Sequence, residues 1–226
     1  MISAGMDSVR AWIVYPERKT KAPVVVVVHE IYGLTPWVRS IADQLAAEGF
    51  IAIAPDLLTT KNLPNATDSV PSQLATAAIK TLDPADVHRQ ISAAARYGMA
   101  LPSALPRYGI VGYCWGGGVS FEHAVRSPDL GAAVVYYGTS PKSETLSSIK
   151  APVLGLYGEN DARVNATISP VDSVMTTLRK TYTHNIYEGA GHGFLRQQNG
   201  QNGANLAATQ QAWPATVAWF RRYLGA

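Results

Sequence analysis

Thiols are all but absent from this chain, because its 226 residues contain a single cysteine, Cys114. One cysteine excludes an internal disulfide framework and a cluster of thiolate metal ligands. Two interpretations of Cys114 remain, an inert residue of the core or a reactive thiol. Its surroundings bear on that choice, since it stands in the segment GIVGYCWGGG, residues 109–118, where five of ten residues are glycine.

Charge is also scarce. Charged residues make up 15% of the chain and apolar residues 47%, a composition typical of a compact globular protein. The net charge is +3, but no basic run of five or more occurs, so the sequence does not indicate a nucleic-acid partner. No apolar stretch approaches the ~18 residues that a membrane-spanning helix needs. We therefore expect no membrane association.

The first residues, MISAGMDSVRAWIVYP, do not have the charged and apolar regions of a signal peptide. We expect a cytoplasmic protein, or an exported one if a leader was removed ahead of this sequence. The expected form is a monomer whose partner is a small molecule.

Apolar runs rich in valine and isoleucine recur along the chain, and several are nearly continuous, as strands buried on both faces should be. They lie at Val9–Tyr15, Pro23–Val28, Phe50–Ala54, Gly109–Tyr113, Ala132–Tyr137, Pro152–Tyr157 and Thr183–Tyr187. Helices are predicted to open at Thr35-Pro36, Asp83-Pro84 and Ser169-Pro170. The alternation predicts a three-layer α/β fold with a mostly parallel central sheet and one domain over residues 1–226. The longest irregular segment, Leu57–Leu82, follows a strand end and could lie over a site there.

Cys114 follows the predicted strand Gly109–Tyr113 and precedes a helix that should run to about Arg126. The spacing Gly112-x-Cys114-x-Gly116 is that of a nucleophile elbow with cysteine in place of serine. Glycine is needed because side chains two residues to either side of the nucleophile would collide in this strained turn. The positive end of the helix favours an anionic sulfur and supplies backbone donors. A glycine-rich turn without chemistry is the alternative.

A carboxylate and an imidazole follow two later strands. The strand Pro152–Tyr157 leads to Asp161, and the strand Thr183–Tyr187 leads to His192 on a glycine-rich loop. The chain order nucleophile, acid, histidine is that of the α/β-hydrolases. In that interpretation Cys114 attacks, His192 shuttles the proton and Asp161 holds the imidazole tautomer. Taken singly, Asp161 as a loop cap and His192 as a surface histidine are the simpler alternatives.

An acyl-transfer site also needs donors for the tetrahedral oxyanion. One candidate is the backbone N–H of Trp115, the residue after the nucleophile. The other is the N–H of Ile31, in the turn that follows the strand Pro23–Val28. Glu30 in this turn would bring a carboxylate to the nucleophile, whereas an exposed loop acid without a role is the alternative.

These residues resemble the dienelactone hydrolase family over nearly the whole chain, from Ala22 to Leu224. The segments that carry the resemblance are VVVVHEIYGL, APDLL, GYCWGGG, VVYYG, APVLGLYGEND and GAGHGF. A cysteine elbow combined with a glutamate in the oxyanion turn separates this family from most esterases. The resemblance implies a cysteine hydrolase that acts on esters or lactones without a metal or other cofactor.

The resemblance also implies roles for single residues. It implies that Glu30 contacts the resting Cys114 and helps control when the thiolate forms. It implies that Arg196, four residues after His192, binds a substrate carboxylate, and that Tyr137 lines the pocket.

The chain departs from the family pattern at three places. Dienelactone-cleaving members carry an arginine and a tyrosine shortly after the APDL segment, where Lys61 can supply charge but not bidentate geometry. Gly193 stands where those members have a serine. The N-terminus has room for one strand where relatives often have a leading hairpin. These departures weaken the inference about the substrate and leave the inference about the reaction intact.

The sequence therefore predicts a hydrolase of small esters or lactones that uses Cys114, Asp161 and His192, with Glu30 as a modulator. One alternative is a general short-chain carboxylesterase or thioesterase with no need for a carboxylate on its substrate. A second is a non-catalytic protein of α/β-hydrolase fold that binds a small ligand, although a binding protein would have no reason to keep all three groups.

Overall fold

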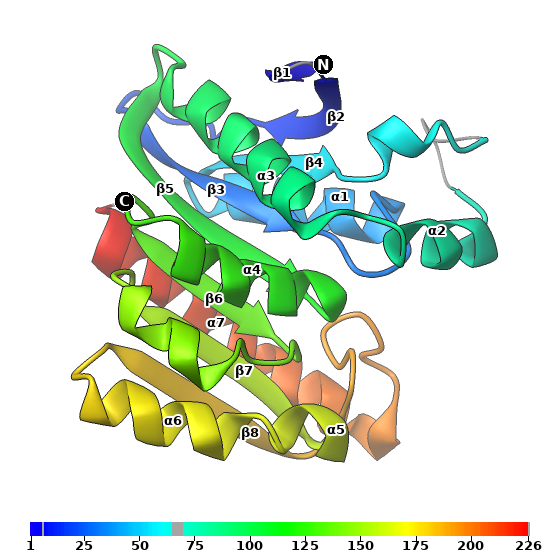
Figure 1. The fold of residues 1–226 in the computed structure, drawn as a ribbon, viewed down its shortest axis with the longest axis vertical. Coiled ribbons are helices and arrows are strands. Elements are labelled where there is room, and N and C mark those ends of the chain that lie inside the picture. Colours follow the sequence, from blue (N-terminus) through cyan, green and yellow to red (C-terminus); the bar gives the residue numbers. More distant parts are fainter. Residues whose placement is uncertain (6, 65–69, 226) are drawn as a thin grey trace. The chain divides into compact units, whose positions relative to one another are not determined.

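The computed structural model describes residues 1–5, 7–64 and 70–225. The chain divides into two compact units, Met1–Gly109 and Ile110–Gly225. Strand β5 (Ala104–Tyr113) contributes residues to both units (Figure 1).

The first unit is built on strands in the order β1-β2-β4-β3. Strand β2 is antiparallel to both of its neighbours, whereas β3 and β4 are parallel. Every residue of β3 and β4 is buried, which explains why their sequences are apolar throughout except at Asp56, the last residue of β4. Helix α3 lies in front of these strands and α1 behind them in Figure 1. The elements are β1 (Ile2–Ala4), β2 (Asp7–Val14), β3 (Ala22–Val28), α1 (Pro36–Ala47), β4 (Ile51–Asp56), η1 (Thr59–Lys61), α2 (Ser72–Ile79) and α3 (Pro84–Met99).

Two expectations about the first unit are wrong. A leading hairpin is present, because β1 pairs antiparallel with β2 and Ile2 lies opposite Val9. The segment Leu57–Leu82 is not irregular throughout, since it contains η1 and the helix α2; its residues 65–69 lie outside the described part of the chain. Alanine, leucine and glutamine supply five of the eight residues of α2, and their helix propensity outweighs the turn-forming residues that favour an irregular segment.

The second unit has the parallel strand order β6-β7-β8. Figure 1 shows α4 and α6 in front of these strands and α7 behind them, so the unit has three layers. Its elements, besides the end of β5, are α4 (Trp115–Arg126), β6 (Ala132–Tyr136), η2 (Ser143–Ser148), β7 (Val153–Asn160), α5 (Ala162–Asn165), α6 (Ile168–Thr177), β8 (Tyr182–Gly191), η3 (Gln201–Gly203) and α7 (Ala204–Leu224).

Two of the three predicted helix starts are confirmed by their caps. Thr35 accepts a hydrogen bond from the Val38 N–H, and Asp83 accepts one from the Ala85 N–H. The third is misplaced, because α6 begins at Ile168 and has Pro170 within its first turn. Proline is tolerated there, since the first N–H groups of a helix have no partner within it.

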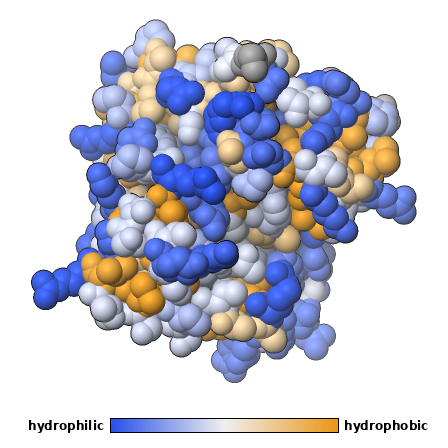
Figure 2. Space-filling view, viewed as in Figure 1, coloured by the Kyte–Doolittle hydropathy of each residue, from blue (hydrophilic) through white to orange (hydrophobic). Residues whose placement is uncertain are grey.

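Polar side chains dominate the one face of the molecule that Figure 2 draws. On the face drawn in Figure 2, hydrophilic residues cover most of the area and hydrophobic ones form smaller groups between them. Within residues 1–5, 7–64 and 70–225, no helix combines the length and apolar character needed to cross a membrane.

Candidate active site

The sharp turn from β5 into α4 presents Cys114. Its backbone has φ 57° and ψ −116°, a conformation that costs about 1–3 kcal/mol for a residue other than glycine. The Cys114 N–H donates to the Tyr136 carbonyl at 3.0 Å and so ties the elbow to β6. A Cβ atom at Gly112 would lie 1.8 Å from the Gly116 carbonyl oxygen. The glycine before the cysteine is therefore a steric requirement of the elbow.

The N-terminus of α4 packs against the end of β6 through backbone atoms. A Cβ at Gly138 would lie 2.2 Å from the Gly118 nitrogen and 2.3 Å from the Gly117 carbonyl carbon. This contact seats the first turn of α4, which begins at the half-buried Trp115. The backbone N–H groups of that turn carry the positive end of the helix dipole, where negative charge is stabilised.

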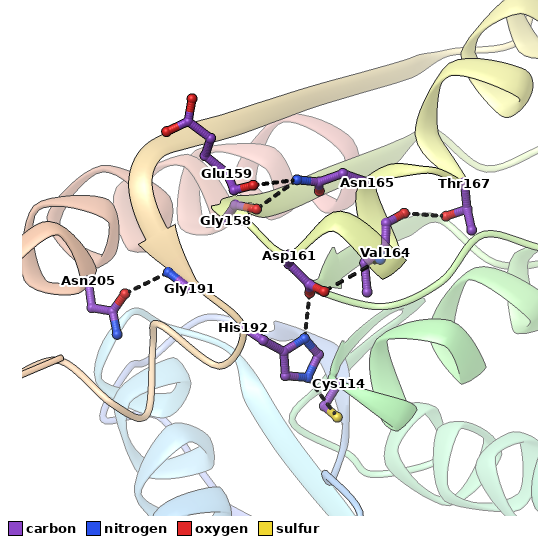
Figure 3. Close-up of polar contacts among 10 residues, drawn as sticks. All are labelled: Cys114, Gly158, Glu159, Asp161, Val164, Asn165, Thr167, Gly191, His192 and Asn205. Atoms are coloured by element: carbon purple, nitrogen blue, oxygen red, sulfur yellow. Dashed lines mark hydrogen bonds and ion pairs between the residues drawn. The ribbon is translucent and has the colours of Figure 1, made fainter. Parts of the chain in front are cut away.

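Three predicted site residues meet at this elbow (Figure 3). His192 Nε2 lies 3.1 Å from Cys114 Sγ, and His192 Nδ1 lies 2.5 Å from Asp161 Oδ2. Asp161 is buried, whereas Cys114 and His192 are partly exposed. The sulfur, the imidazole and the carboxylate thus form one continuous hydrogen-bonded chain, which is exposed to solvent mainly at the sulfur and the imidazole.

The same contacts set the protonation of the imidazole. The hydrogen bond to Cys114 raises the pKa of His192 from 6.5 to about 9; burial opposes this rise and the hydrogen bond to Asp161 adds to it. His192 therefore holds its proton more strongly than a free histidine does. An imidazolium next to sulfur stabilises a negative charge on that atom.

Asp161 is held by its own local structure. Its Oδ1 accepts from the Val164 N–H at 3.4 Å and caps α5, which leaves Oδ2 for His192. The capping role and the contact with the imidazole therefore coexist. Asn165 donates from Nδ2 to the carbonyls of Gly158 and Glu159 at 2.9 and 3.1 Å, and so fixes the end of β7 just before Asp161 (Figure 3).

The end of β8, which leads to His192, is tied to the end of β7. Glu159 accepts from the Gly189 N–H at 2.8 Å, and Asn160 donates to the Gly189 carbonyl at 2.9 Å. The two strand ends approach so closely that a Cβ at Gly158 would lie 2.6 Å from the Ala190 carbonyl oxygen. Sequence reasoning gave Glu159 and Asn160 no role, because their partners lie about thirty residues away along the chain.

Two predicted substrate-binding residues lie near His192. Tyr137 is fully buried, and its ring meets the His192 ring in a T-shaped contact with centroids 5.2 Å apart. It therefore supports the imidazole from within the core. Arg196 is half-buried in the turn after His192, where its N–H donates to the Gly193 carbonyl at 3.0 Å.

The remaining predicted residues belong to the first unit. Glu30 is buried directly after β3, and Ile31 follows it in a turn. Lys61 donates from Nζ to the Thr81 carbonyl at 3.1 Å, which engages its charge within its own segment.

His29 orients this turn, a role that sequence reasoning did not assign. The Leu57 N–H donates to His29 Nε2 at 3.2 Å, so the ring proton must sit on Nδ1, which contacts the Glu30 carbonyl at 2.7 Å. Burial lowers the pKa of His29, in agreement with a neutral ring. Because the Glu30 carbonyl is held on one side, the Ile31 N–H of the same trans peptide points the opposite way. The position of His29 at the strand end, before Glu30, was the available signal.

In the described ranges, no cluster of three or more histidine, cysteine, aspartate or glutamate side chains is arranged to hold a metal ion.

A cysteine in an elbow after β5, a carboxylate after β7 and a histidine after β8, in this chain order, are the arrangement that characterises the α/β-hydrolases. The structure of a Klebsiella pneumoniae protein, provisionally named dienelactone hydrolase, matches with a TM-score of 0.84 and 28% identity over 96% of this chain and 94% of that one. The predicted α/β-hydrolase fold is thereby confirmed.

Sequence comparison gives the family. The model of the dienelactone hydrolase family matches residues 9–224. A Salmonella typhimurium protein, provisionally named carboxymethylenebutenolidase, is 33% identical and covers 99% of this chain and 89% of its own. A Bradyrhizobium protein, provisionally named 2-oxo-3-(5-oxofuran-2-ylidene)propanoate lactonase, is 27% identical over 99% of this chain and 93% of its own. The chain belongs to the dienelactone hydrolase family and is a hydrolase of lactone or ester bonds.

Proposed function

We propose that residues 1–226 act as a single domain that opens small lactones or esters through a covalent adduct on Cys114, without a metal or other cofactor. The observation that carries the proposal is the 3.1 Å contact between Cys114 Sγ and His192 Nε2, with Asp161 on the far side of the same imidazole. A nucleophile, a base and an orienting acid in this order are the parts that acyl transfer needs.

In the first half of the reaction, Cys114 Sγ bonds to the substrate carbonyl carbon while His192 holds the proton that left the sulfur. The C–O bond then breaks, and His192 Nε2 gives that proton to the leaving oxygen, which stays tethered when the substrate is a lactone. In the second half, His192 removes a proton from water as the water attacks the thioester. The C–S bond then breaks, and the proton returns to the sulfur. Asp161 keeps the imidazole in one orientation throughout.

The oxyanion that forms on the carbonyl needs donors. We assign this role to the backbone N–H groups of Trp115 and Ile31. The position of Trp115 at the start of α4 and the peptide orientation that His29 gives to Ile31 support the assignment. Glu30 is proposed as the modulator of the Cys114 thiolate, and its burial favours such a role over that of a solvated surface acid.

For the substrate, we propose a lactone or ester that carries a carboxylate, bound by Arg196 beside His192. The name of the Bradyrhizobium relative describes such a molecule, a lactone ring with a propanoate group. Tyr137 shapes the wall behind His192, and Lys61 is a weaker candidate for the carboxylate because Thr81 already engages its ammonium group. Because the charge of Lys61 is engaged in this way, the site has less positive charge to offer a substrate carboxylate. This favours the second candidate function, a general short-chain esterase.

The nucleophile is tested with p-nitrophenyl acetate and a thiol alkylator. Cys114→Ala should lose several powers of ten in turnover, and Cys114→Ser should keep a small residue because the oxyanion donors remain. Wild-type turnover in Cys114→Ala would contradict the mechanism. Absence of turnover in the wild type with every ester and lactone, alongside ligand binding, would favour the non-catalytic alternative.

The substrate class is tested with an acidic and a neutral lactone of matched size. Arg196→Ala should lower kcat/KM for the acidic substrate by roughly ten- to a hundredfold and leave the neutral one nearly unchanged. Lys61→Ala is the matched control and should affect both substrates weakly. An equal loss on both substrates in Arg196→Ala would support the general esterase instead.

A further inference from the structure

A buried amide on α7 binds the loop that carries His192. Asn205 lies in the first turn of α7 and is 2% exposed. Its Oδ1 accepts from the Gly191 N–H at 2.9 Å, and its Nδ2 donates to the Gln197 carbonyl at 2.7 Å (Figure 3 draws the first contact). Both partners lie outside the helix, so this side chain serves the loop and not the helix.

The two anchor points flank the functional part of the loop. The Gly191 N–H belongs to the residue immediately before His192, and the Gln197 carbonyl belongs to the residue immediately after Arg196. Between them the backbone closes on itself, because the Gln197 N–H donates to the Gly193 carbonyl at 2.9 Å. One amide therefore holds both ends of a closed segment that carries the imidazole and the guanidinium.

A second tie from the same helix holds the middle of the segment. Thr209 donates from Oγ1 toward the Phe194 carbonyl at 3.3 Å and the Asn205 carbonyl at 2.9 Å. The Phe194 ring packs against the Tyr137 ring, which in turn meets His192. The loop thus rests on α7 at its start, middle and end.

The amide of Asn205 lies against Gly200, which has no side chain to compete with it. A Cβ at Gly200 would lie 2.8 Å from Asn205 Nδ2 and 3.1 Å from the Gln197 carbonyl oxygen. The contact between Asn205 and Gln197 therefore depends on a glycine at position 200. A side chain there would push the amide off the loop.

We propose that Asn205 is a positioning residue that holds His192 within hydrogen-bonding reach of both Cys114 and Asp161. The inference rests on the proposed catalytic role of His192. Gly191 precedes His192 directly, so a rotation of that peptide moves the imidazole relative to a sulfur that the rigid elbow holds in place. An error of about 1 Å in such a contact can cost a hundredfold in rate.

The experiment compares two variants of Asn205 with a control on the same helix. Asn205→Leu has a similar volume and removes both hydrogen bonds, whereas Asn205→Asp keeps the acceptor for the Gly191 N–H and loses the donor to Gln197. Thr216→Val is the control, because Thr216 is also buried and hydrogen-bonded on α7 but contacts Tyr136 and Ala212 instead of the loop.

We expect kcat to fall roughly ten- to a hundredfold in Asn205→Leu and less in Asn205→Asp, with little change in KM for a neutral ester. In Thr216→Val we expect a lower Tm and an unchanged kcat. A second readout does not need turnover. The pKa of His192, followed by NMR, should drop from about 9 toward 6.5 in Asn205→Leu and stay near 9 in Thr216→Val.

The NMR readout separates this inference from the proposed function. If the wild type shows no hydrolysis but Asn205→Leu still lowers the pKa of His192, the positioning role stands and the proposed reaction fails. If Asn205→Leu lowers Tm as Thr216→Val does, while kcat and the pKa of His192 stay at wild-type values, Asn205 is a structural residue and the inference is overturned. Should Asn205→Leu not fold, Asn205→Ala also removes both hydrogen bonds, and an unchanged kcat and pKa of His192 in that variant would overturn the inference equally.

Discussion

Cys114 and its two partners, Asp161 and His192, are held in place by different means, although all three stand at strand ends of the second unit. Backbone packing positions Cys114, since glycines at 112 and 138 allow main-chain atoms to approach within distances that any Cβ would block. Side-chain hydrogen bonds position Asp161 and His192, through Asn165 at the end of β7 and Glu159 and Asn205 around β8.

These two modes of support should respond differently to substitution. Steric packing is nearly all-or-none, because one added methyl group at the elbow meets backbone that cannot rotate away. A set of hydrogen bonds is graded, because each contributes about 0.5–1.5 kcal/mol and the others remain when one is removed. A single substitution at the elbow should therefore be enough to disrupt it. Each substitution in the loops that carry Asp161 and His192 should remove only part of their stability.

The largest effect is expected at the elbow. Gly112→Ala places a methyl group against the Gly116 carbonyl and should cost more than about 3 kcal/mol or prevent folding, as measured by urea unfolding and soluble yield. Gly118→Ala is the matched control, because its Cβ would meet Thr139 atoms no closer than 3.3 Å. If Gly112→Ala is as stable and active as Gly118→Ala, the steric account of the elbow is wrong.

The second largest effect is expected when the negative charge of Asp161, which contacts His192, is removed. Asp161→Asn keeps the size of the side chain but removes the negative charge that supports an imidazolium. We expect kcat to fall by about two to four powers of ten and the pKa of His192 to move down from about 9. Steady-state kinetics and an NMR titration measure the two effects. A wild-type kcat would remove Asp161 from the mechanism.

A smaller effect is expected from a change in pH. The stability contributed by the loop that carries His192 should depend on pH, whereas the stability contributed by the elbow should not. The pKa of His192 is raised from 6.5 to about 9 on folding, so its stabilising contribution is complete below about pH 6.5 and is lost as the pH rises toward 9. The difference in Tm between the wild type and His192→Gln should shrink over that range. The elbow variant Gly118→Ala should show no such convergence with the wild type. A constant or widening gap for His192→Gln would contradict the assigned contacts.

The smallest effect is expected from the exposed tie between β7 and β8. Glu159→Gln weakens the charge-assisted bond to the Gly189 N–H and should cost about 0.5 kcal/mol or less, with kcat within about twofold of the wild type. Glu188→Gln, at an exposed position on β8, is the control for a change in net charge. A loss of kcat as large as that of Asn205→Leu would mean that the loops are held all-or-none, like the elbow.

Much of this arrangement could be predicted because its signals are local. The strands, the helix caps at Thr35 and Asp83 and the elbow around Cys114 each depend on residues within a few positions of one another. The meeting of Cys114, Asp161 and His192 could also be anticipated, since parallel strands bring their carboxyl ends to one edge.

The predictions from sequence are wrong where local signals for helix, strand and turn compete or are too short to read. The sequence pattern does not reveal α2, because prolines and asparagines precede it and only three of its eight residues are alanine. The start of α6 was misplaced because Pro170 resembles a first helical residue, whereas here it falls within the first turn. The hairpin of β1 and β2 was missed because β1 has three residues, too few to show an alternating pattern.

Which residues could do chemistry, and which strand end would present each of them, follows from the sequence, because backbone propensity and glycine sterics act over short distances along the chain. The side chains that orient those residues are visible only in the folded protein. The hydrogen bonds of His29, Glu159 and Asn205 join positions 28, 30 and 14 residues apart. No periodicity or motif encodes such contacts, since they exist only after the strands have paired and the helices have packed against them.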